Sequence, residues 1–225
     1  MQLKPANYSV IYHNDKQDLW NAPDGAYKTL IEFYKEQLHK HDIKLIHLST
    51  EGHEGWGDVN IHYPGNPEEV MWNRENFFVK FLKEDAEDEY YWFGEPDVII
   101  NKLPLPTDCD LCVLARPNDG VKINPTFRLA KKSALPYFEE LVENYNMDKK
   151  KWHGDSDAHA YIGNKLESMR KFSIGKHEYN GMKIELREHD KYLHQQKSEF
   201  LRHFKFTNKK SLLEMIERQN EDRRA

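Results

Sequence analysis

The run EYYWFGEPDVIIN at residues 89–101 constrains the fold most, because it is apolar enough for a central strand yet contains Glu95, Pro96 and Asp97. Proline cannot donate to a strand ladder and is not found in the middle of a sheet. We therefore predict that the strand breaks at residues 94–97 and that the chain turns there. Residues 95 and 97 share a face by strand alternation, so the run places two carboxylates together at a strand end.

Strand-like and helix-like segments alternate in the first half of the chain. Apolar, β-branched runs predict strands at 8–12, 43–50 and 58–64. Helical spacing of apolar residues predicts a helix over about 25–40 and another that begins near residues 67–69. Such alternation is typical of an α/β fold with a mostly parallel sheet flanked by helices, in which ligands bind at the carboxyl ends of the strands.

The second half of the chain is mixed, without an internal repeat. The elements predicted there are strands at 110–116 and 122–131, the latter broken at Asn124-Pro125, a helix from Ser133 to Tyr145 with Ser133 as its cap, a helix opened by WHGDSDAH, and a helix at 211–220. A length of 225 residues fits one domain. We expect a single domain over 1–225.

Composition excludes several classes of protein. The charged fraction is 32%, the mean hydropathy is −0.91, and no apolar run approaches the ~20 residues that span a bilayer. The N-terminal stretch lacks the design of a signal peptide, so we expect a cytoplasmic protein. The net charge of −5 gives the whole surface no general attraction for nucleic acid. Cys109 and Cys112 are interpreted as reduced thiols.

Arg74 falls on the apolar stripe of the predicted second helix, four residues after Val70 and three before Phe77. An unpaired charge on a buried face is costly. Two explanations remain open: the side chain reaches water or a structural carboxylate, or it is aimed at a ligand or at an acid in a site.

Three acid-x-acid motifs could bind a divalent cation through oxygen ligands. They are Glu95-Pro96-Asp97, Asp108-Cys109-Asp110 and Asp155-Ser156-Asp157. Each of them is also compatible with a turn or a helix start. The pattern alone does not choose among them.

The stretch HFKFTNKK at 203–210 gathers positive charge in an acidic protein. Imidazole is a good ligand for Mn²⁺-type ions, and lysines neutralise phosphates. A solvated basic stretch before a helix is the other explanation. No glycine loop of the nucleotide-binding types and no G-x-S-x-G elbow is present, which disfavours kinases, dehydrogenases and hydrolases.

The order of the motifs resembles nucleotide-diphosphosugar glycosyltransferases of the GT-A fold. The stretches that carry the resemblance are YSVIYHND, the inward Arg74, WFGEPDVII, KINPTFRLA, WHGDSDAH and HFKFTNKK. It implies an α/β, Rossmann-like mixed sheet, mostly parallel and flanked by helices. Within the single domain it implies a nucleotide-binding half at about 1–105 and an acceptor half at about 106–225. It also implies a divalent ion, Mn²⁺ or Mg²⁺, and a nucleotide-diphosphate sugar as the donor substrate.

The resemblance assigns roles to particular residues. Metal ligands would be Glu95, Asp97 and His203, with Glu95 where the family usually has Asp. Residues near the chemistry would be Asn124, Asp155 and Asp157, although Pro125-Thr126 and Ser156 replace the small residue-Gly pair and the Gln of the family pattern. Donor contacts would come from Tyr12, Asn14, Arg74, Lys205, Lys209 and Lys210.

The resulting hypothesis is a metal-dependent glycosyltransferase with a UDP-linked donor. The acceptor stays open among glycans, lipid-linked sugars, proteins and hydroxymethylated bases of phage DNA, because the composition resembles that of tailed-phage proteins. Basic residues that could follow a DNA backbone are Lys131, Lys132, Lys149–Lys151 and Arg170–Lys171. The alternatives are a non-catalytic nucleotide-sugar binding module and a metal-dependent phosphodiesterase or nuclease.

Overall fold

The computed structural model describes most of the chain, and all structural statements below refer to that part. The described residues are 4–13, 26–50, 56–116, 122–149, 154–194, 198–204 and 208–222, with the side chains of Asn208 and Lys209 outside the description. Asn14 and Lys205 lie outside the described residues.

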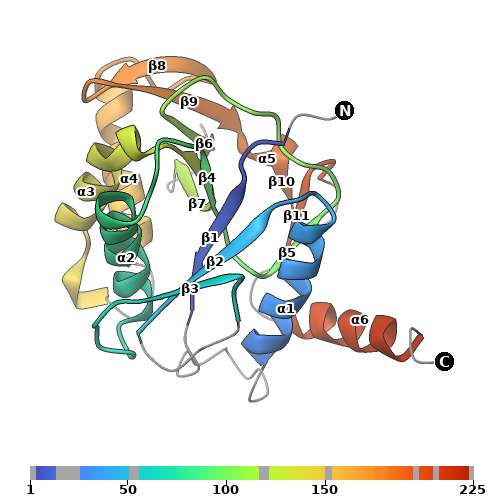
Figure 1. Ribbon diagram of the computed structural model, residues 1–225. Coiled ribbons are helices and arrows are strands. Elements are labelled where there is room, and N and C mark those ends of the chain that lie inside the picture. Colours follow the sequence, from blue (N-terminus) through green and yellow to red (C-terminus); the bar gives the residue numbers. More distant parts are fainter. Residues whose placement is uncertain are drawn as a thin grey trace.

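A large sheet of eight strands forms the centre of the molecule, in the order β3-β2-β1-β4-β7-β6-β9-β8 (Figure 1). Its strands are β1 (Tyr8–Tyr12), β2 (Lys44–Ser49), β3 (Val59–His62), β4 (Tyr91–Phe93), β6 (Leu111–Ala115), β7 (Ile123–Ala130), β8 (Gly175–Tyr179) and β9 (Met182–Glu188). β3, β2, β1 and β4 run parallel to one another, and β6 runs parallel to β9. β7 is antiparallel to both β4 and β6, and β8 is antiparallel to β9. The prediction of a mostly parallel α/β sheet is confirmed.

Helices cover both faces of this sheet. The described helices are α1 (Ala26–His39), α2 (Val70–Glu84), α3 (Leu135–Glu143), α4 (Gly154–Ser168), the short α5 (His189–Tyr192) and α6 (Asn208–Asp222), of which α6 packs on α1. Strand alternation divides the core. Val10 and Tyr12 pack in the cluster with α2, α3 and α4, whereas Ile11 packs in the cluster with α1. In Figure 1, α2, α3 and α4 accordingly lie on one side of the sheet and α1 on the other.

The predicted strand break creates a second, small sheet. After β4 the chain leaves the large sheet at Gly94–Asp97 and forms β5 (Val98–Ile100), which pairs antiparallel with β11 (Leu201–His203); β11 pairs with β10 (Leu193–His194). Gln37 of α1 fastens β5 through both ends of its amide, donating to the Val98 carbonyl at 3.1 Å and accepting from the Ile100 N–H at 2.7 Å. The break therefore turns one apolar run into strands of two sheets.

Two local predictions are wrong. The first concerns β7, which continues through Asn124-Pro125. Its pairing with β6 skips three residues, since Val113 pairs with Arg128 and the next residue, Leu114, pairs with Asn124. Pro125 lies among the skipped residues, where no backbone N–H is needed for pairing with β6. Ser133 is no helix cap. It lies in a 3₁₀ turn before α3, and its hydroxyl donates to Asp110 instead.

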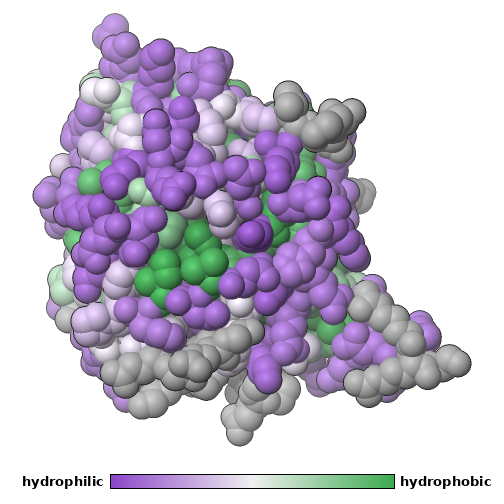
Figure 2. All heavy atoms as spheres, in the orientation of Figure 1, coloured by the Kyte–Doolittle hydropathy of each residue, from purple (hydrophilic) through white to green (hydrophobic). Residues whose placement is uncertain are grey.

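The surface agrees with the hydrophilic composition. Figure 2 shows a face that is mainly hydrophilic, with a hydrophobic patch near its centre. Among the described residues, none of the helices combines the length and the apolar character that crossing a bilayer requires.

Gly154 at the start of α4 offers a test of the packing there. A Cβ at this position would lie 2.3 Å from Cε1 and 2.6 Å from Cζ of Tyr145, which is closer than atoms can approach. Gly154→Ala should therefore lower the free energy of unfolding by about 1–3 kcal/mol, as overpacking does. Urea unfolding measures this. Ser156→Ala on the same helix turn is the control, and an equal effect of the two substitutions would contradict the packing argument.

Candidate functional site

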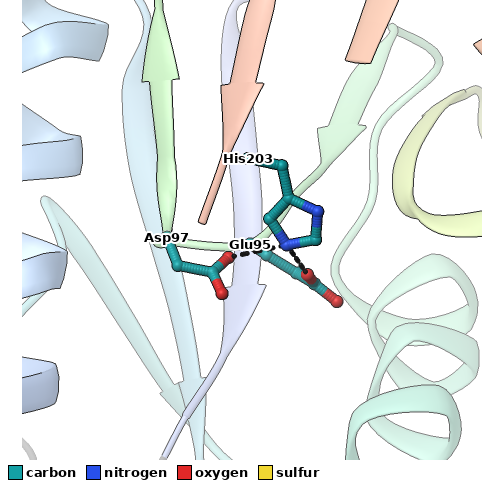
Figure 3. A group of neighbouring side chains, drawn as sticks. All are labelled: Glu95, Asp97 and His203. Carbon is teal, nitrogen blue, oxygen red and sulfur yellow. Dashed lines mark ion pairs between the residues drawn. The ribbon is translucent and has the colours of Figure 1, made fainter. Parts of the chain in front are cut away.

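Glu95, Asp97 and His203 meet at the junction of the two sheets. The His203 Nε2 atom lies 3.3 Å from Glu95 Oε2 and 3.3 Å from Asp97 Oδ1 (Figure 3). The pairing of β11 with β5 causes this, because His203 is the register partner of Val98 and the Phe204 N–H donates to the Asp97 carbonyl at 2.9 Å. One ligand atom from each of the three residues lies within 4.8 Å of the other two.

The charges of this trio depend on one another. Burial by itself lowers the pKa of His203, but the carboxylates of Asp97 and Glu95 outweigh it and raise this pKa to about 9. Burial raises the pKa of Glu95, and His203 and Arg74 reverse the effect and lower this pKa to about 2. The imidazole is thus held as an imidazolium between two carboxylates at neutral pH.

Arg74 is buried and bound by three carboxylates. Its Nε donates to Glu75 Oε1 at 2.9 Å, its Nη1 to Glu95 Oε1 at 2.8 Å, and its Nη2 to Asp155 Oδ2 at 2.7 Å. Burial lowers the pKa of the guanidinium, but the three acids raise it well above its ordinary value. The inward arginine therefore binds acids, and two of these, Glu95 and Asp155, are predicted site residues.

A second buried arginine lies behind this one. Arg128 of β7 donates from Nη1 and Nη2 to the two oxygens of Glu75, at 2.5 and 3.2 Å. Its guanidinium lies 5.0 Å from the ring centre of Phe78 and 5.2 Å from that of Phe138. Glu75 is 0% exposed and Arg128 is 1% exposed, so water contributes nothing to this pair.

The start of α4 presents Asp155 to the cluster. One carboxylate oxygen binds Arg74, while the other, Oδ1, is buried and has no hydrogen-bond partner among the described residues. His159, one turn later, donates from Nδ1 to the Asp155 carbonyl at 2.7 Å. Asp155 therefore has a free acceptor position beside Arg74, which also binds Glu95 of the trio.

Asn124 is buried at the far end of a short polar chain that leads back to Glu95. Its Oδ1 accepts from the Thr126 N–H at 2.8 Å, and the Thr126 hydroxyl donates to Glu95 Oε2 at 3.2 Å. Its Nδ2 donates to His189 Nε2 at 3.2 Å. The structure brings Asn124 near the site but engages its amide within the protein.

The structure describes three further predicted residues, Tyr12, Asp157 and Lys210. Asp157 is on the outer side of α4, where Asn146 and Lys149 donate to it at 2.7 and 2.8 Å. Tyr12 is buried against Phe77. Lys210 is exposed on α6. Asn14, Lys205 and the side chain of Lys209 lie outside the described residues.

The rival acid-x-acid motif has other tasks. Asp108 pairs with Lys176 at 2.5 Å. Asp110 accepts from the Ser133 hydroxyl and from the Lys183 N–H. Both residues therefore serve local structure rather than the cluster of Glu95, Asp97 and His203.

Glu75, Arg128, Thr126 and His159 are part of the site region and were not predicted. A signal existed for two of them. Glu75 stands next to an inward arginine in a helix, and Arg128 is the one charge in the strand INPTFRLA. Two opposite charges in buried elements indicate that they pair. The other two residues carry no such signal.

Removing the charge of Arg74 should be costly. Arg74→Met leaves three carboxylates without their shared cation, and we expect the free energy of unfolding to fall by about 3–5 kcal/mol, the cost of breaking a buried pair. Denaturant unfolding measures the change. Arg218→Met, which removes an exposed partner of Glu214, should cost less than about 1 kcal/mol. Equal costs for the two substitutions would contradict the assigned role of Arg74.

The stability of the protein should also fall in mild acid because of His159. Burial lowers the pKa of its imidazole from the ordinary 6.5 to about 4. Between these values the unfolded chain binds a proton that the folded protein refuses, so stability decreases as the pH falls from 6.5 to 4, by up to about 3 kcal/mol. Unfolding free energies at several pH values measure the slope. His159→Gln should flatten it, and an unchanged slope would show that another group is responsible.

The comparisons with known proteins concern the fold. No family model matches the sequence, and no curated protein matches it. Among solved structures, a glycosyltransferase involved in the glycosylation of the major capsid of PBCV-1 superimposes with a TM-score of 0.57 at 12% identity, covering 93% of this chain and 98% of that one. The galactosyltransferase LgtC, solved with donor and acceptor sugar analogues, gives a TM-score of 0.47 at 12% identity, covering 94% of each chain. The superposition on the first of these structures supports the GT-A fold that the order of the motifs implied.

Proposed function

We propose that this protein is a metal-dependent glycosyltransferase that moves a sugar from a nucleotide-diphosphate donor, UDP-linked, to an acceptor. One observation carries the proposal. On a GT-A fold, Glu95, Asp97 and His203 converge from two distant parts of the chain at the junction of the two sheets.

The donor set fits a divalent ion such as Mn²⁺ or Mg²⁺. Two carboxylates and an imidazole suit Mn²⁺-type ions. Ligand atoms around one such ion lie at most about 4–5 Å apart, and the three atoms here are within 4.8 Å of one another. Such an ion, when bound, supplies positive charge to a diphosphate leaving group.

The protein's own residues would perform the remaining tasks. Asp97 and Glu95 attract the cation, and His203 must give up its proton to become a ligand, so proton and cation compete for Nε2. Asp155 keeps a buried acceptor oxygen for a hydroxyl of the transferred sugar. Arg74 screens Asp155 from Glu95 and holds both. The nucleotide of the donor would bind mainly to the half of the chain at about 1–105, and the acceptor to the half at about 106–225.

For the acceptor we propose a glycan rather than phage DNA. Four of the basic residues that could follow a DNA backbone have partners of their own within the described part of the protein. Lys131 lies 4.7 Å over the ring of Tyr90, Lys132 donates to the Ala86 carbonyl, Lys149 pairs with Asp157, and Lys171 donates to the Glu178 carbonyl. A strip of lysines that bind their own protein is a poor backbone track.

The test is turnover with a panel of nucleotide sugars and Mn²⁺, monitored by release of the nucleoside diphosphate and by thermal stabilisation. Asp97→Asn and His203→Gln should each lower transfer by more than about 100-fold. Substitutions of residues that only support metal ligands cost about 10- to 100-fold, so the loss of a ligand itself should cost more. Asp108→Asn removes an exposed acid of the rival motif and should leave transfer unchanged.

Three outcomes would contradict the proposal. If the protein bound a nucleotide sugar but transferred none of the sugars in the panel, it would be a nucleotide-sugar binding module. Cleavage of nucleic acid without a sugar donor would indicate a phosphodiesterase or nuclease. Transfer to hydroxymethylated DNA, with oligosaccharides inert, would replace the glycan by DNA as acceptor.

A further inference from the structure

The buried pair of Glu75 and Arg128 is not explained by the binding of a metal ion or a donor. Neither residue belongs to the trio of Glu95, Asp97 and His203, and both are almost completely inaccessible. Their charges nevertheless lie one side chain away from the site, because Glu75 also accepts from Arg74.

Stability alone is a weak reason for such a pair. Removing two ions from water costs several kcal/mol each, and apolar residues of similar volume often give equal or greater stability. Around Arg128 the surroundings are already apolar, with the rings of Phe78 and Phe138 on the guanidinium. An apolar replacement would fit these surroundings, which indicates that the pair serves another purpose.

The geometry indicates this purpose. A guanidinium is a rigid plane, so fixing one of its nitrogens in direction fixes the other two. Glu75 binds Nε of Arg74, and Arg128 holds both oxygens of Glu75 from behind. The remaining nitrogens, Nη1 and Nη2, then point at Glu95 and Asp155, at 2.8 and 2.7 Å.

We propose that Glu75 and Arg128 are positioning residues, which orient the Arg74 guanidinium and through it set the placement of the Glu95 and Asp155 carboxylates in the transferase site. The proposal rests on the proposed function for its kinetic consequences, but its structural content does not depend on the reaction. Neither residue touches the substrate. Their effect passes through Arg74 alone.

A double variant separates positioning from folding. Glu75→Leu/Arg128→Met replaces both charges by apolar groups and leaves Arg74 with its two other acids. We expect an unfolding midpoint close to that of the unmodified protein, a kcat lower by about 10- to 100-fold, and a Kd for Mn²⁺ alone higher by about 10-fold, the range for residues that orient ligands. KM for the nucleotide sugar should change less than kcat.

Two single variants guard against a fold defect. Glu75→Gln keeps an acceptor for Arg74 Nε and should restore much of the lost kcat. Glu140→Gln is the matched control, since Glu140 is a buried carboxylate that binds Lys165, Tyr179 and Asn180 away from the site. It should lower stability without changing the KM, the kcat or the Kd for Mn²⁺. If the double variant does not fold, the two single variants decide. The kcat of Glu75→Gln should then fall further below that of the unmodified protein than the kcat of Glu140→Gln does, and equal decreases would overturn the proposal.

A crystal structure of the double variant tests the positioning directly, without any activity. The contacts of Arg74 Nη1 with Glu95 and Nη2 with Asp155 should open from 2.8 and 2.7 Å beyond hydrogen-bonding distance, at one or both acids. Unchanged contacts together with unchanged kcat and Kd would overturn the proposal. If the unmodified protein neither binds Mn²⁺ nor transfers sugar, the proposed function fails, and the two contacts alone then decide whether Glu75 and Arg128 position Arg74.

Discussion

Arg74 introduces a permanent positive charge into the core, and the architecture around the site follows from the need to balance it. Its three carboxylate partners come from its own helix, from the strand break after β4 and from the start of α4. An unpaired buried charge costs several kcal/mol, so the native arrangement must bring these three segments together at once. The charge therefore couples the packing of α2 and α4 to the exit of the chain from the large sheet. It connects helix packing to the position of Glu95.

The exit from the large sheet is itself a requirement of the site. Had the run at 89–101 continued as one strand, Asp97 would lie within the ladder of the large sheet. Instead β5 turns away, Gln37 fastens it to α1, and β11 finds a free edge with which to pair. This pairing places His203 beside Asp97, although more than half of the described helices and strands lie between the two residues in the sequence. A proline that weakens one strand thus provides the edge on which the second part of the site is assembled.

The sequence permitted prediction where one local rule decided the structure. The break at Glu95–Asp97 and the helical stripes with Leu30, Phe77 and Ile162 depend on alternation, proline chemistry and helical periodicity, which act over a few residues. The convergence of Asp97 with His203 could be predicted only from the resemblance in motif order, since no local rule brings β11 to β5. The contacts of Arg74 with Glu95 and Asp155 could not be predicted, because each depends on the register and the packing of a different element. Pro125 misled for the same reason: whether a proline breaks a strand depends on the hydrogen bonds of the neighbouring strand, which only the sheet register reveals.

The formal charges of the site also argue for an ion of charge two. Four carboxyl groups, those of Glu75, Glu95, Asp97 and Asp155, face two guanidinium groups, those of Arg74 and Arg128, and the His203 imidazolium. Loss of the His203 proton leaves two negative charges uncompensated in a mostly buried cluster, and a divalent cation balances both. A monovalent cation would leave one carboxylate uncompensated, at a cost that rises as the local dielectric constant falls. The buried arginines thus matter beyond their contacts, because without them the same acids would carry four negative charges, and a single divalent ion could not neutralise the site.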